Sequence, residues 1–527
     1  MSSRLLAALA LAAALTPASA HATALVLGRS EATIQRATTL AIMRHGKRTA
    51  ISIQITVEGP TDDALVIVPL PTPIQPPQLH GLSHAVFDRL DRRSAPRLVE
   101  LWEQPPCDGI HSHNEPPRPD LGLRRTPDRR HRSELRNIYT HTGSPAGYEP
   151  DILGARDSRH ILRWLRARDR PVPPRAAEAL QRLADAGTSF LVLRLTDAQV
   201  RRDPHGRAVL PPFRVDYESD NLTLPLALLT AAPPYDLVVH VIAASRHQAV
   251  GRPNLVVPSA LDVTPTTRDA FDDFYGALLT RTVTPGAVVT EHAHGYPICH
   301  FCEFPNLMYI ELHALGASAL WIPEQPPSIA REPDTMPTGA IAVPDDDPFQ
   351  PTEQRILNKR ATRPHPEGSL DLPWSFTLTR LRLRLDPDDP DSTLTLYPVS
   401  PSPTLGEVRH EIHASTIHTD RFYPHYFIKH PWIGPIACQA PIRGIWGRPP
   451  DGTTRPEPRR VTAVPRDTPD TPLEFFLAVD EPTKVTALPA AYPPPLHNAR
   501  CDHSSDHPPL ALIFFMLLHR RRRGPPP

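Results

Sequence analysis

The sequence lacks net charge and lacks the common motifs of catalysis. Its 57 Lys and Arg residues balance 57 Asp and Glu residues, so no overall field draws nucleic acid or anionic lipid to the protein. There is no glycine-rich loop to cradle a phosphate and no Gly-x-Ser-x-Gly nucleophile elbow. The Arg-rich stretch at residues 124–136 has no interleaved aromatic residues for base stacking, which favours a solvated linker. We therefore expect no nucleic-acid partner and no cofactor.

The sequence also lacks an apolar run of the roughly 20 residues that a membrane-spanning helix needs. At the N-terminus, a short apolar stretch at residues 5–15 follows Arg4, and Ala18-Ser19-Ala20 has the small-x-small pattern that signal peptidase accepts. The stretch is too short for a retained anchor. The pattern therefore predicts a signal peptide at residues 1–20, with cleavage after Ala20.

The C-terminal tail, residues 501–527, combines a cysteine, an apolar run and an arginine cluster. Cys501 precedes nine apolar residues at 510–518 and four arginines at 520–523. Nine helical residues reach only about 14 Å, against a hydrocarbon core of about 30 Å. The arginines would stay on the cytoplasmic side through the positive-inside bias. The arrangement resembles the C-terminal sorting tails of myxobacterial surface proteins, although its apolar run is short. That resemblance makes Cys501 a processing or lipidation candidate and the tail a candidate membrane contact.

Proline is abundant, and its clusters mark boundaries along the chain. The sequence has 68 prolines, and three stretches in which they cluster suit extended linkers. The predicted parts are the signal peptide at 1–20, an N-terminal hairpin, strand and helix part at 21–104, a Pro/Arg-rich linker at 105–136, a central α+β part at 137–322, a Pro/Asp-rich linker at 323–373, a C-terminal β part at 374–447, a Pro-rich stalk at 448–500 and the tail at 501–527.

Between the linkers, the hydrophobic pattern changes between the periods of strands and helices. Apolar and polar residues alternate at 51–57, which predicts a half-buried strand. Ser83 is a candidate N-cap for a following helix. Further strands are expected at residues 39–43, 64–68, 190–195, 237–242, 288–290, 376–385 and 426–428, and further helices at 158–168, 175–186 and around 271–278. Strands interrupted by helices without a strict βαβ rhythm predict an α+β fold with mixed, mostly antiparallel sheets.

Four cysteines lie in the body of the chain: Cys107, Cys299, Cys302 and Cys438. In an oxidising compartment they predict two disulfides with three possible connectivities, and we prefer Cys107–Cys438 with Cys299–Cys302. The alternative is a zinc site, because two thiolates and the imidazoles of the preceding His292 and His294 can complete a tetrahedron. The spacing departs from common zinc fingers, and exported thiols tend to oxidise, so we predict no metal.

The motif Arg44-His45-Gly46-Lys47-Arg48 copies the signature of histidine phosphatases. In those enzymes the histidine attacks phosphorus and the arginines hold the phosphate oxygens. Such enzymes also need a second histidine beside an acid, and no His-Asp dipeptide occurs in this sequence. Because the residues after the motif alternate as a strand, we interpret His45-Gly46-Lys47 as the turn of a hairpin. No residue is therefore assigned a catalytic role.

The remaining candidates favour structural roles. His410 and His413 lack the i, i+4 spacing of a metalloprotease helix, and with His418, His425 and His430 they suggest a solvated loop rather than an adventitious metal site. Trp432 and Trp446, beside proline and glycine, are expected to be core anchors.

Six stretches of the sequence resemble an uncharacterised bacterial family, domain of unknown function 2330. They begin, in chain order, with IMRHGKRTAISIQITVEGPTDDALVIVPLP, HAVFDRLDRRSAPRLVELWEQPPC and FRVDYESDNLTLPLALL, and continue with PGAVVTEHA and the following CHFC, FTLTRLRLRLD, and YFIKHPWIGPIACQAPIRGIWG. The family usually opens with a Cys-containing segment, which residues 21–35 lack. The resemblance implies an exported or surface protein and supplies no mechanism.

Together these features predict an exported protein of the cell envelope, outer membrane or cell surface. We expect a non-enzymatic binding or structural module with an unknown partner. Two alternatives stay open: a histidine-phosphatase-like hydrolase using Arg44-His45-Gly46, and a zinc-binding envelope protein using His292, His294, Cys299 and Cys302.

Overall fold

The computed structural model describes most of the body of the chain. The described residues are 23–107, 147–196, 200–229, 235–297, 307, 309–320, 375–385, 393–402, 405, 410–412, 415–417, 420–449, 456, 458–461, 471–478 and 486–488. The predicted signal peptide with Ala20, most of the predicted linkers, Cys299, Cys302 and the tail with Cys501 lie outside these residues.

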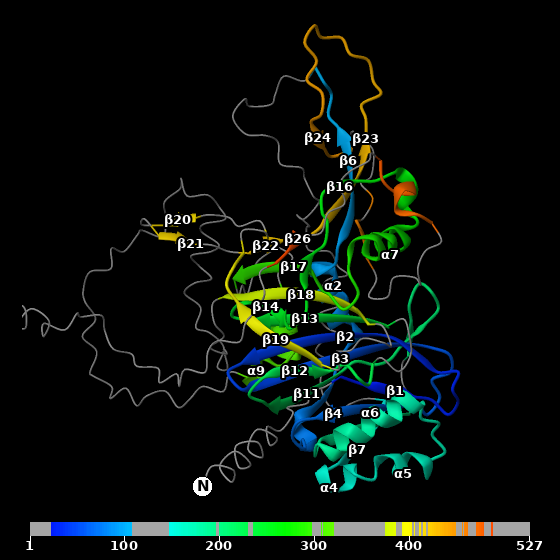
Figure 1. The fold of residues 1–527 in the computed structure, drawn as a ribbon. Coiled ribbons are helices and arrows are strands. Elements are labelled where there is room, and N and C mark those ends of the chain that lie inside the picture. Colours follow the sequence, from blue (N-terminus) through cyan, green and yellow to red (C-terminus); the bar gives the residue numbers. More distant parts are fainter. Residues whose placement is uncertain are drawn as a thin grey trace, which may run out of the picture. The chain divides into compact units, whose positions relative to one another are not determined.

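The fold is α+β, with mixed and mostly antiparallel sheets (Figure 1). The described residues contain one sheet of twelve strands, to which the N-terminal, central and C-terminal parts of the chain all contribute. Its path runs β26 (Thr486–Ala487), β15 (Asn254–Val256), β17 (Val288–Pro297), β18 (Ser375–Leu385), β13 (Tyr235–Ala243), β2 (Ile34–His45), β3 (Arg48–Glu58), β10 (Ala208–Val209) and β9 (Arg201–Arg202), with β11 (Phe213–Glu218), β5 (Leu79–Gly81) and β22 (Arg421–Phe422) paired beside it.

The hairpin of β2 and β3 lies within this sheet and is buried on both faces. One face packs in a core with residues of β13 and β18, as the apolar positions predict. The other face carries Ser52 and Thr56, which the alternation placed toward solvent, yet both are buried. Helices cover this face: α2 (His84–Ser94), α8 (Tyr309–Ala314) and α9 (Ala317–Leu320) pack with Ala50. The prediction of a half-buried strand is therefore wrong, because helices from other parts of the chain cover the polar face.

A second sheet of four strands packs against the same core. Its order is β1 (Leu25–Leu27), β4 (Leu65–Leu70), β8 (Ser189–Leu195) and β7 (Tyr148–Leu153), and α4 (Ala155–Ser158), α5 (Ile161–Arg166) and α6 (Pro174–Asp185) follow β7 and precede β8. In Figure 1 these helices lie together beside the four strands, and a separate apolar cluster joins helices and sheet. A three-stranded sheet of β12 (Leu222–Pro225), β19 (Thr393–Val399) and β14 (Arg246–Val250) contributes to the same core. The strands β20 (His410–Ile412) and β21 (Ser415–Ile417) form a separate two-stranded sheet.

The helix boundaries follow local sequence signals in most places. The Ser83 side chain accepts a hydrogen bond from the backbone N–H of Ala85 and caps α2, as predicted. Gly187, with a φ of 81°, follows α6. The helix predicted at 158–168 is instead broken into α4 and α5, because His160 leaves the helical conformation and the Ser158 hydroxyl donates to the carbonyl of Ala155.

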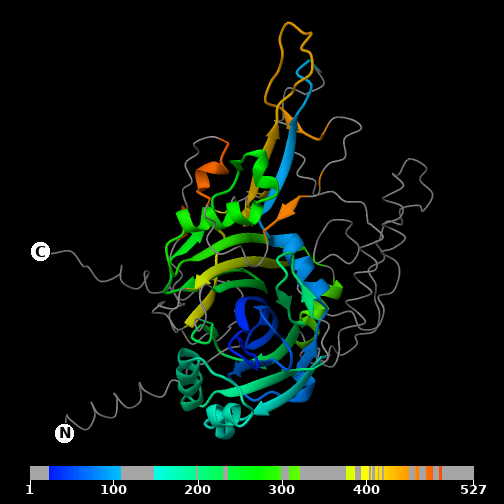
Figure 2. The same cartoon turned by 90° about the vertical axis from the view of Figure 1, so that its right-hand side faces the viewer.

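The fifth sheet holds strands from distant parts of the sequence. Its order is β16 (Leu261–Asp262), β23 (His425–His430), β6 (Arg97–Glu103) and β24 (Trp446–Gly447), with β25 (Arg459–Arg460) also paired to β6. β6 and β23 are parallel, and Figures 1 and 2 show them side by side along their length. Helix α7 (Phe271–Thr282) packs on this sheet with η5 (Leu473–Phe475) in one apolar cluster. The short helix η3 (Pro265–Arg268) directly precedes α7, and η2 (Pro76–Gln78) directly precedes β5.

No helix in the described part of the chain is long and apolar enough to cross a membrane.

Candidate functional site

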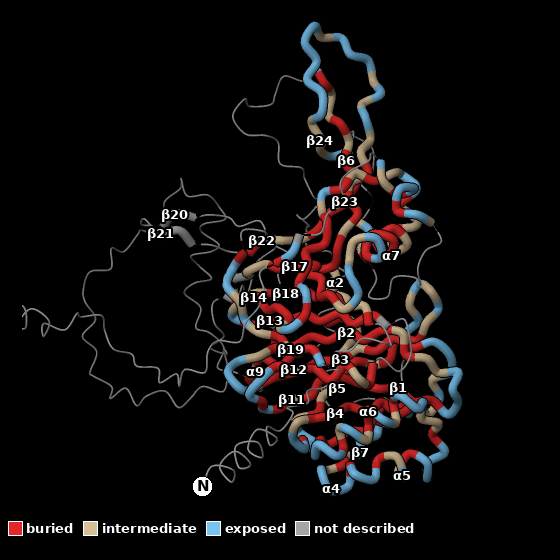
Figure 3. The backbone as a smooth tube through the Cα atoms, viewed as in Figure 1, coloured by how far each residue is buried: buried red, intermediate tan, exposed pale blue. Residues whose placement is uncertain are grey.

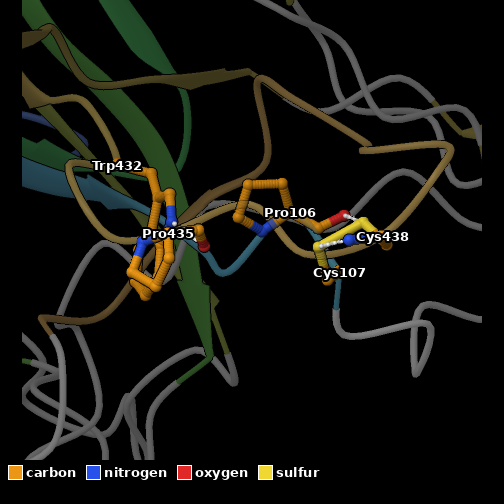
Figure 4. Close-up of a disulfide and its surroundings, with 5 residues drawn as sticks. All are labelled: Pro106, Cys107, Trp432, Pro435 and Cys438. Atoms are coloured by element: carbon orange, nitrogen blue, oxygen red, sulfur yellow. Dashed lines mark hydrogen bonds between the residues drawn. A yellow bond between two sulfur atoms is a disulfide. The ribbon is translucent and has the colours of Figure 1, made fainter.

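A disulfide joins the end of β6 to the loop that follows β23. Cys107 and Cys438 are bonded, with Cα atoms 5.5 Å apart, and Figure 4 shows the bond beside Pro106. This is the pairing that the sequence analysis preferred. Residues 431–445, between β23 and β24, form what we call the stapled loop, and Figure 3 shows this region mostly exposed. The bond fixes the middle of the loop to a strand of the body.

Glu103, the last residue of β6, holds both ends of the stapled loop. Its buried carboxylate accepts the backbone N–H of Trp432 at 2.9 Å and of Gly444 at 2.8 Å. It also accepts two hydrogen bonds from the Arg443 guanidinium, at 2.8 and 2.9 Å. Burial alone would raise the pKa of Glu103, but these donors outweigh it and hold the pKa below its usual value. The loop is therefore organised around an ionised carboxylate.

Further backbone hydrogen bonds join the stapled loop to the segment that follows β6. The N–H of Ile442 donates to the carbonyl of Pro106 at 2.9 Å, and the N–H of Gln104 to the carbonyl of Ile445 at 2.8 Å. The N–H of Cys438 lies 3.2 Å from the sulfur of Cys107. Prolines at 431, 435 and 441 have no N–H to satisfy. Together with the bonds to Glu103, these hydrogen bonds satisfy the N–H groups of Trp432, Ile442 and Gly444, at the two ends of the loop.

Large apolar side chains of the stapled loop face solvent. Ile433 is 97% exposed, Ile442 48% and Ile436 44%. Among the described residues, the remaining large apolar side chain of this kind is Phe475, in η5. An apolar side chain held in water gains free energy when a partner covers it. Three exposed isoleucines on one braced loop make the stapled loop the candidate functional site.

Trp432 lies at the start of the loop and is only half-buried. Its indole N–H donates to the carbonyl of Pro435 at 3.5 Å (Figure 4). A Cβ at Gly434 would lie 2.5 Å from the indole ring, so the ring packs over the backbone of this glycine. Trp446, also half-buried, has the Lys429 ammonium 5.4 Å from its ring centroid. The prediction that both tryptophans are core anchors is wrong, because Trp432 lies on the mostly exposed stapled loop and Trp446 on β24, at the edge of its sheet.

The base of the loop contains two histidines that the sequence assigned to a solvated loop. His430 stacks on Trp102, with ring centroids 4.6 Å apart, and its Nε2 lies 2.8 Å from a carboxylate oxygen of Glu100. His425 is buried at the start of β23. The loop prediction is wrong for both, because β6 pairs with this segment from more than 300 residues away.

The proposed zinc ligands His292 and His294 lie on β17, with ring centroids 6.4 Å apart. His292 is buried, and burial together with the charge of His294 lowers its pKa well below the usual value. Cys299 and Cys302, with which they would share a metal, lie outside the described residues. Within the ranges that the structure describes, no group of three His, Cys, Asp or Glu side chains is arranged for a metal ion.

The phosphatase-like motif forms the turn of the β2–β3 hairpin, as its strand alternation predicts. His45 pairs with Arg48, and Gly46 adopts a φ of 58° that favours glycine. The Arg44 guanidinium donates to the hydroxyls of Thr49 and Ser219, at 2.9 and 3.1 Å, and to two backbone carbonyls. These bonds commit Arg44 to bracing the turn, whereas the phosphatase motif needs it to hold phosphate.

Replacing His45 by Ala is expected to change the free energy of unfolding by less than about 0.5 kcal/mol, since the side chain is exposed at a turn. Hydrolysis of p-nitrophenyl phosphate by the purified protein should be at background for both the wild type and the variant. If the wild type hydrolysed the ester and His45→Ala did not, the hydrolase hypothesis would be restored.

A buried ionic cluster crosses β17 and β18. Glu291 lies between the guanidinium groups of Arg380 and Arg382, with its Oε2 2.7 Å from Nε of Arg380 and its Oε1 also paired to Arg382. The Tyr275 hydroxyl donates to Glu291 at 2.7 Å. Glu291 and both arginines are at most 1% exposed. A substrate cannot reach groups that have no contact with solvent, so this cluster supports the fold.

The family comparison covers the first half of the structure. Residues 16–266 match the model of DUF2330, described as an uncharacterized protein conserved in bacteria. This part of the chain, a little under half of its length, is similar to the DUF2330 family. The DUF2330 segment contains the β2–β3 hairpin and the first three stretches on which the resemblance was based, and it ends before β17 and the stapled loop. No curated protein matches the chain.

The stapled loop was not predicted from the sequence as an exposed surface. Its signal was present: residues 431–450 contain three isoleucines that prove exposed, two tryptophans, five prolines and no Asp or Glu. A segment that is rich in large apolar residues and proline, and that contains a disulfide-bonded cysteine, suits an exposed binding loop better than a strand of the core.

Proposed function

We propose that this protein is exported to the cell envelope and, without catalysing a reaction, binds the lipid–water interface of a membrane through the stapled loop. The observation that carries the proposal is the exposure of Ile433, Ile436 and Ile442 on a loop fixed by a disulfide. Export is supported by the signal-peptide pattern at residues 1–20 and by the disulfide, since such bonds persist in oxidising compartments.

The chemistry of the loop favours lipid over a protein groove. Membrane interfaces attract tryptophan, whose ring is apolar and whose N–H is polar, and the loop carries Trp432 with Trp446 just after it. Polar backbone groups are costly to bury in an apolar phase unless they are hydrogen-bonded, and those of Trp432, Ile442 and Gly444, at the ends of the loop, are bonded within the protein. Arg448, exposed just after the loop, suits anionic headgroups, and no acidic residue lies between 431 and 450.

Co-sedimentation of the full-length, disulfide-bonded protein with vesicles of phosphatidylglycerol and phosphatidylethanolamine tests the proposal. The bound fraction should rise with vesicle concentration. Reduction of the Cys107–Cys438 disulfide should weaken the affinity for vesicles about tenfold, because the opened loop must be ordered again on binding. Absence of binding to these vesicles, or equal binding after reduction, would contradict it. Recovery of the native protein from the cytoplasmic fraction would contradict export.

A further inference from the structure

The zero net charge of the chain conceals a local excess of positive charge on the helices beside the four-stranded sheet. Residues 156–168, within the DUF2330 segment, include most of α4 and all of α5 and contain five arginines and one acidic residue, Asp157. All five arginines are exposed: Arg156, Arg159, Arg163, Arg166 and Arg168. We call these five side chains the arginine patch; Figure 3 shows exposed segments of the backbone at α4 and α5.

The packing of α5 turns its charged side toward solvent. Ile161 and Leu165 are buried in the apolar cluster that joins the helices to the four-stranded sheet, and Trp164 packs against this cluster. Residues three apart lie on the same side of a helix, so Arg163 and Arg166 are neighbours on the exposed side. The contacts that anchor α5 therefore keep these arginines accessible to a ligand.

No ion pair joins the arginine patch to an acidic side chain in the described part of the chain. Arg163 donates to Nδ1 of His160 at 2.7 Å, and the Arg168 guanidinium lies 3.6 Å from the ring centroid of Trp164. Neither contact neutralises an arginine with a carboxylate. Like charges three or four residues apart on a helix repel one another. An anion that covers the patch replaces this repulsion with attraction.

The side chains of this surface favour a hydrated polymer over a membrane or a protein partner. The large apolar side chains that are exposed in the described chain lie on the stapled loop and at Phe475, and none belongs to α4, α5 or α6. A helix that binds a membrane surface buries apolar side chains in the lipid, and a protein interface needs a central anchor that fills a pocket. The arginine patch offers charge without either feature.

Trp164 is the aromatic residue of this surface, and its position disfavours single-stranded nucleic acid. Such nucleic acids stack their bases on free aromatic faces. Arg168 lies over one face of the Trp164 ring, and the side chain also packs against the apolar cluster. The ring is therefore poorly placed to stack a base.

We propose that the arginine patch binds an anionic polysaccharide, a polymer whose sugar units carry carboxylate groups. A guanidinium group donates two parallel hydrogen bonds to a carboxylate, and a polymer presents several carboxylates to several arginines at once. Its hydroxyl groups stay hydrated, so the contact needs no apolar surface. The proposal is independent of the stapled loop; export matters to it only because an exported protein meets such polymers in the cell envelope.

Binding of the full-length protein to immobilised polygalacturonate, measured by biolayer interferometry at several salt concentrations, tests the proposal. The wild type should bind, and its affinity should fall as salt rises, because salt screens exposed charges. Replacing both Arg159 and Arg166 by Ala should weaken binding about fivefold to tenfold, since two of the five charges are lost. Both side chains are exposed and alanine favours helices, so the fold should be intact.

The matched control replaces Arg281 and Arg421 by Ala. Both side chains are exposed, one at the end of α7 and the other on β22, so the control removes the same charge outside the arginine patch. Its affinity for polygalacturonate should equal that of the wild type.

Absence of polygalacturonate binding by the wild type at low salt would overturn the proposal. An equal loss of affinity in the two double variants would also overturn it, since binding would then follow total charge rather than the arginine patch. Tighter binding of a single-stranded oligothymidylate, or of phosphatidylglycerol vesicles, that is lost in the variant of Arg159 and Arg166 would assign the patch to nucleic acid or to lipid instead.

Discussion

Replacing Ile433 by Asp should weaken vesicle binding by about 10- to 100-fold. Ile433 is 97% exposed in the free protein. Transfer of such a side chain from water to an apolar phase contributes about 1.5–3 kcal/mol, and each 1.4 kcal/mol corresponds to a factor of ten in affinity. The free energy of unfolding should stay within about 0.5 kcal/mol of the wild type, because the side chain makes little contact in the fold. Vesicle titration and urea unfolding measure the two quantities.

Phe475→Asp is the matched control for this experiment. Phe475 is also a large, exposed apolar residue, at 56%, but it lies in η5 and outside the stapled loop. Vesicle binding of this variant should equal that of the wild type. An equal loss of vesicle affinity in both variants would indicate non-specific hydrophobic adsorption. Unchanged vesicle binding by Ile433→Asp would place the membrane contact in another part of the chain.

Replacing Glu291 by Gln should destabilise the protein by about 3–5 kcal/mol, the usual result of breaking a buried ion pair from one side. The substitution leaves Arg380 and Arg382 buried with one carboxylate fewer. Arg380 then keeps an ion pair with Asp91 only, and Arg382 keeps one with Asp236, whose Oδ2 lies 3.2 Å from Nη1 of Arg382. Urea unfolding measures the loss. Glu218→Gln, at a side chain 70% exposed, is the control and should change stability by less than about 0.5 kcal/mol.

The same cluster predicts how stability depends on pH. Burial would raise the pKa of Glu291, but the adjacent Arg382 and Arg380 lower it from 4.5 to about 2. A depressed carboxylate pKa contributes stability that is present above the unfolded value and is lost as the pH falls through the folded value. Between about pH 4.5 and 2 the wild type should therefore lose about 3 kcal/mol that Glu291→Gln does not lose. Parallel pH profiles of the two proteins would contradict this role of Glu291.

The elements that the sequence predicted well depend on local signals. The β2–β3 hairpin follows from strand alternation around Gly46, and α2 follows from its Ser83 cap. The alternating arginines of β18 show the limit of such signals. Arg380 and Arg382 have the spacing of a solvent-facing strand, yet both are buried. Their acid partner Glu291 lies about 90 residues earlier in the sequence, and only the assembled sheet brings them together.

The stapled loop depended on contacts that are even more distant in sequence. Cys107 and Cys438 are 331 residues apart, so chain spacing alone could not distinguish their pairing from the other connectivities. The parallel alignment of β6 and β23 likewise has no local signal. This alignment leaves residues 431–445 without a covering layer in the described structure, which turns an expected core segment into an exposed one.

Hydrogen exchange with and without vesicles tests the central claim most directly, because it reports which segment of the unmodified protein meets the lipid. We predict that vesicles slow amide exchange in peptides covering residues 431–445. Peptides of the buried β2–β3 hairpin should exchange at the same rate in both conditions. Bound protein whose residues 431–445 exchange at an unchanged rate, while another segment becomes protected, would contradict the claim that the stapled loop is the membrane contact.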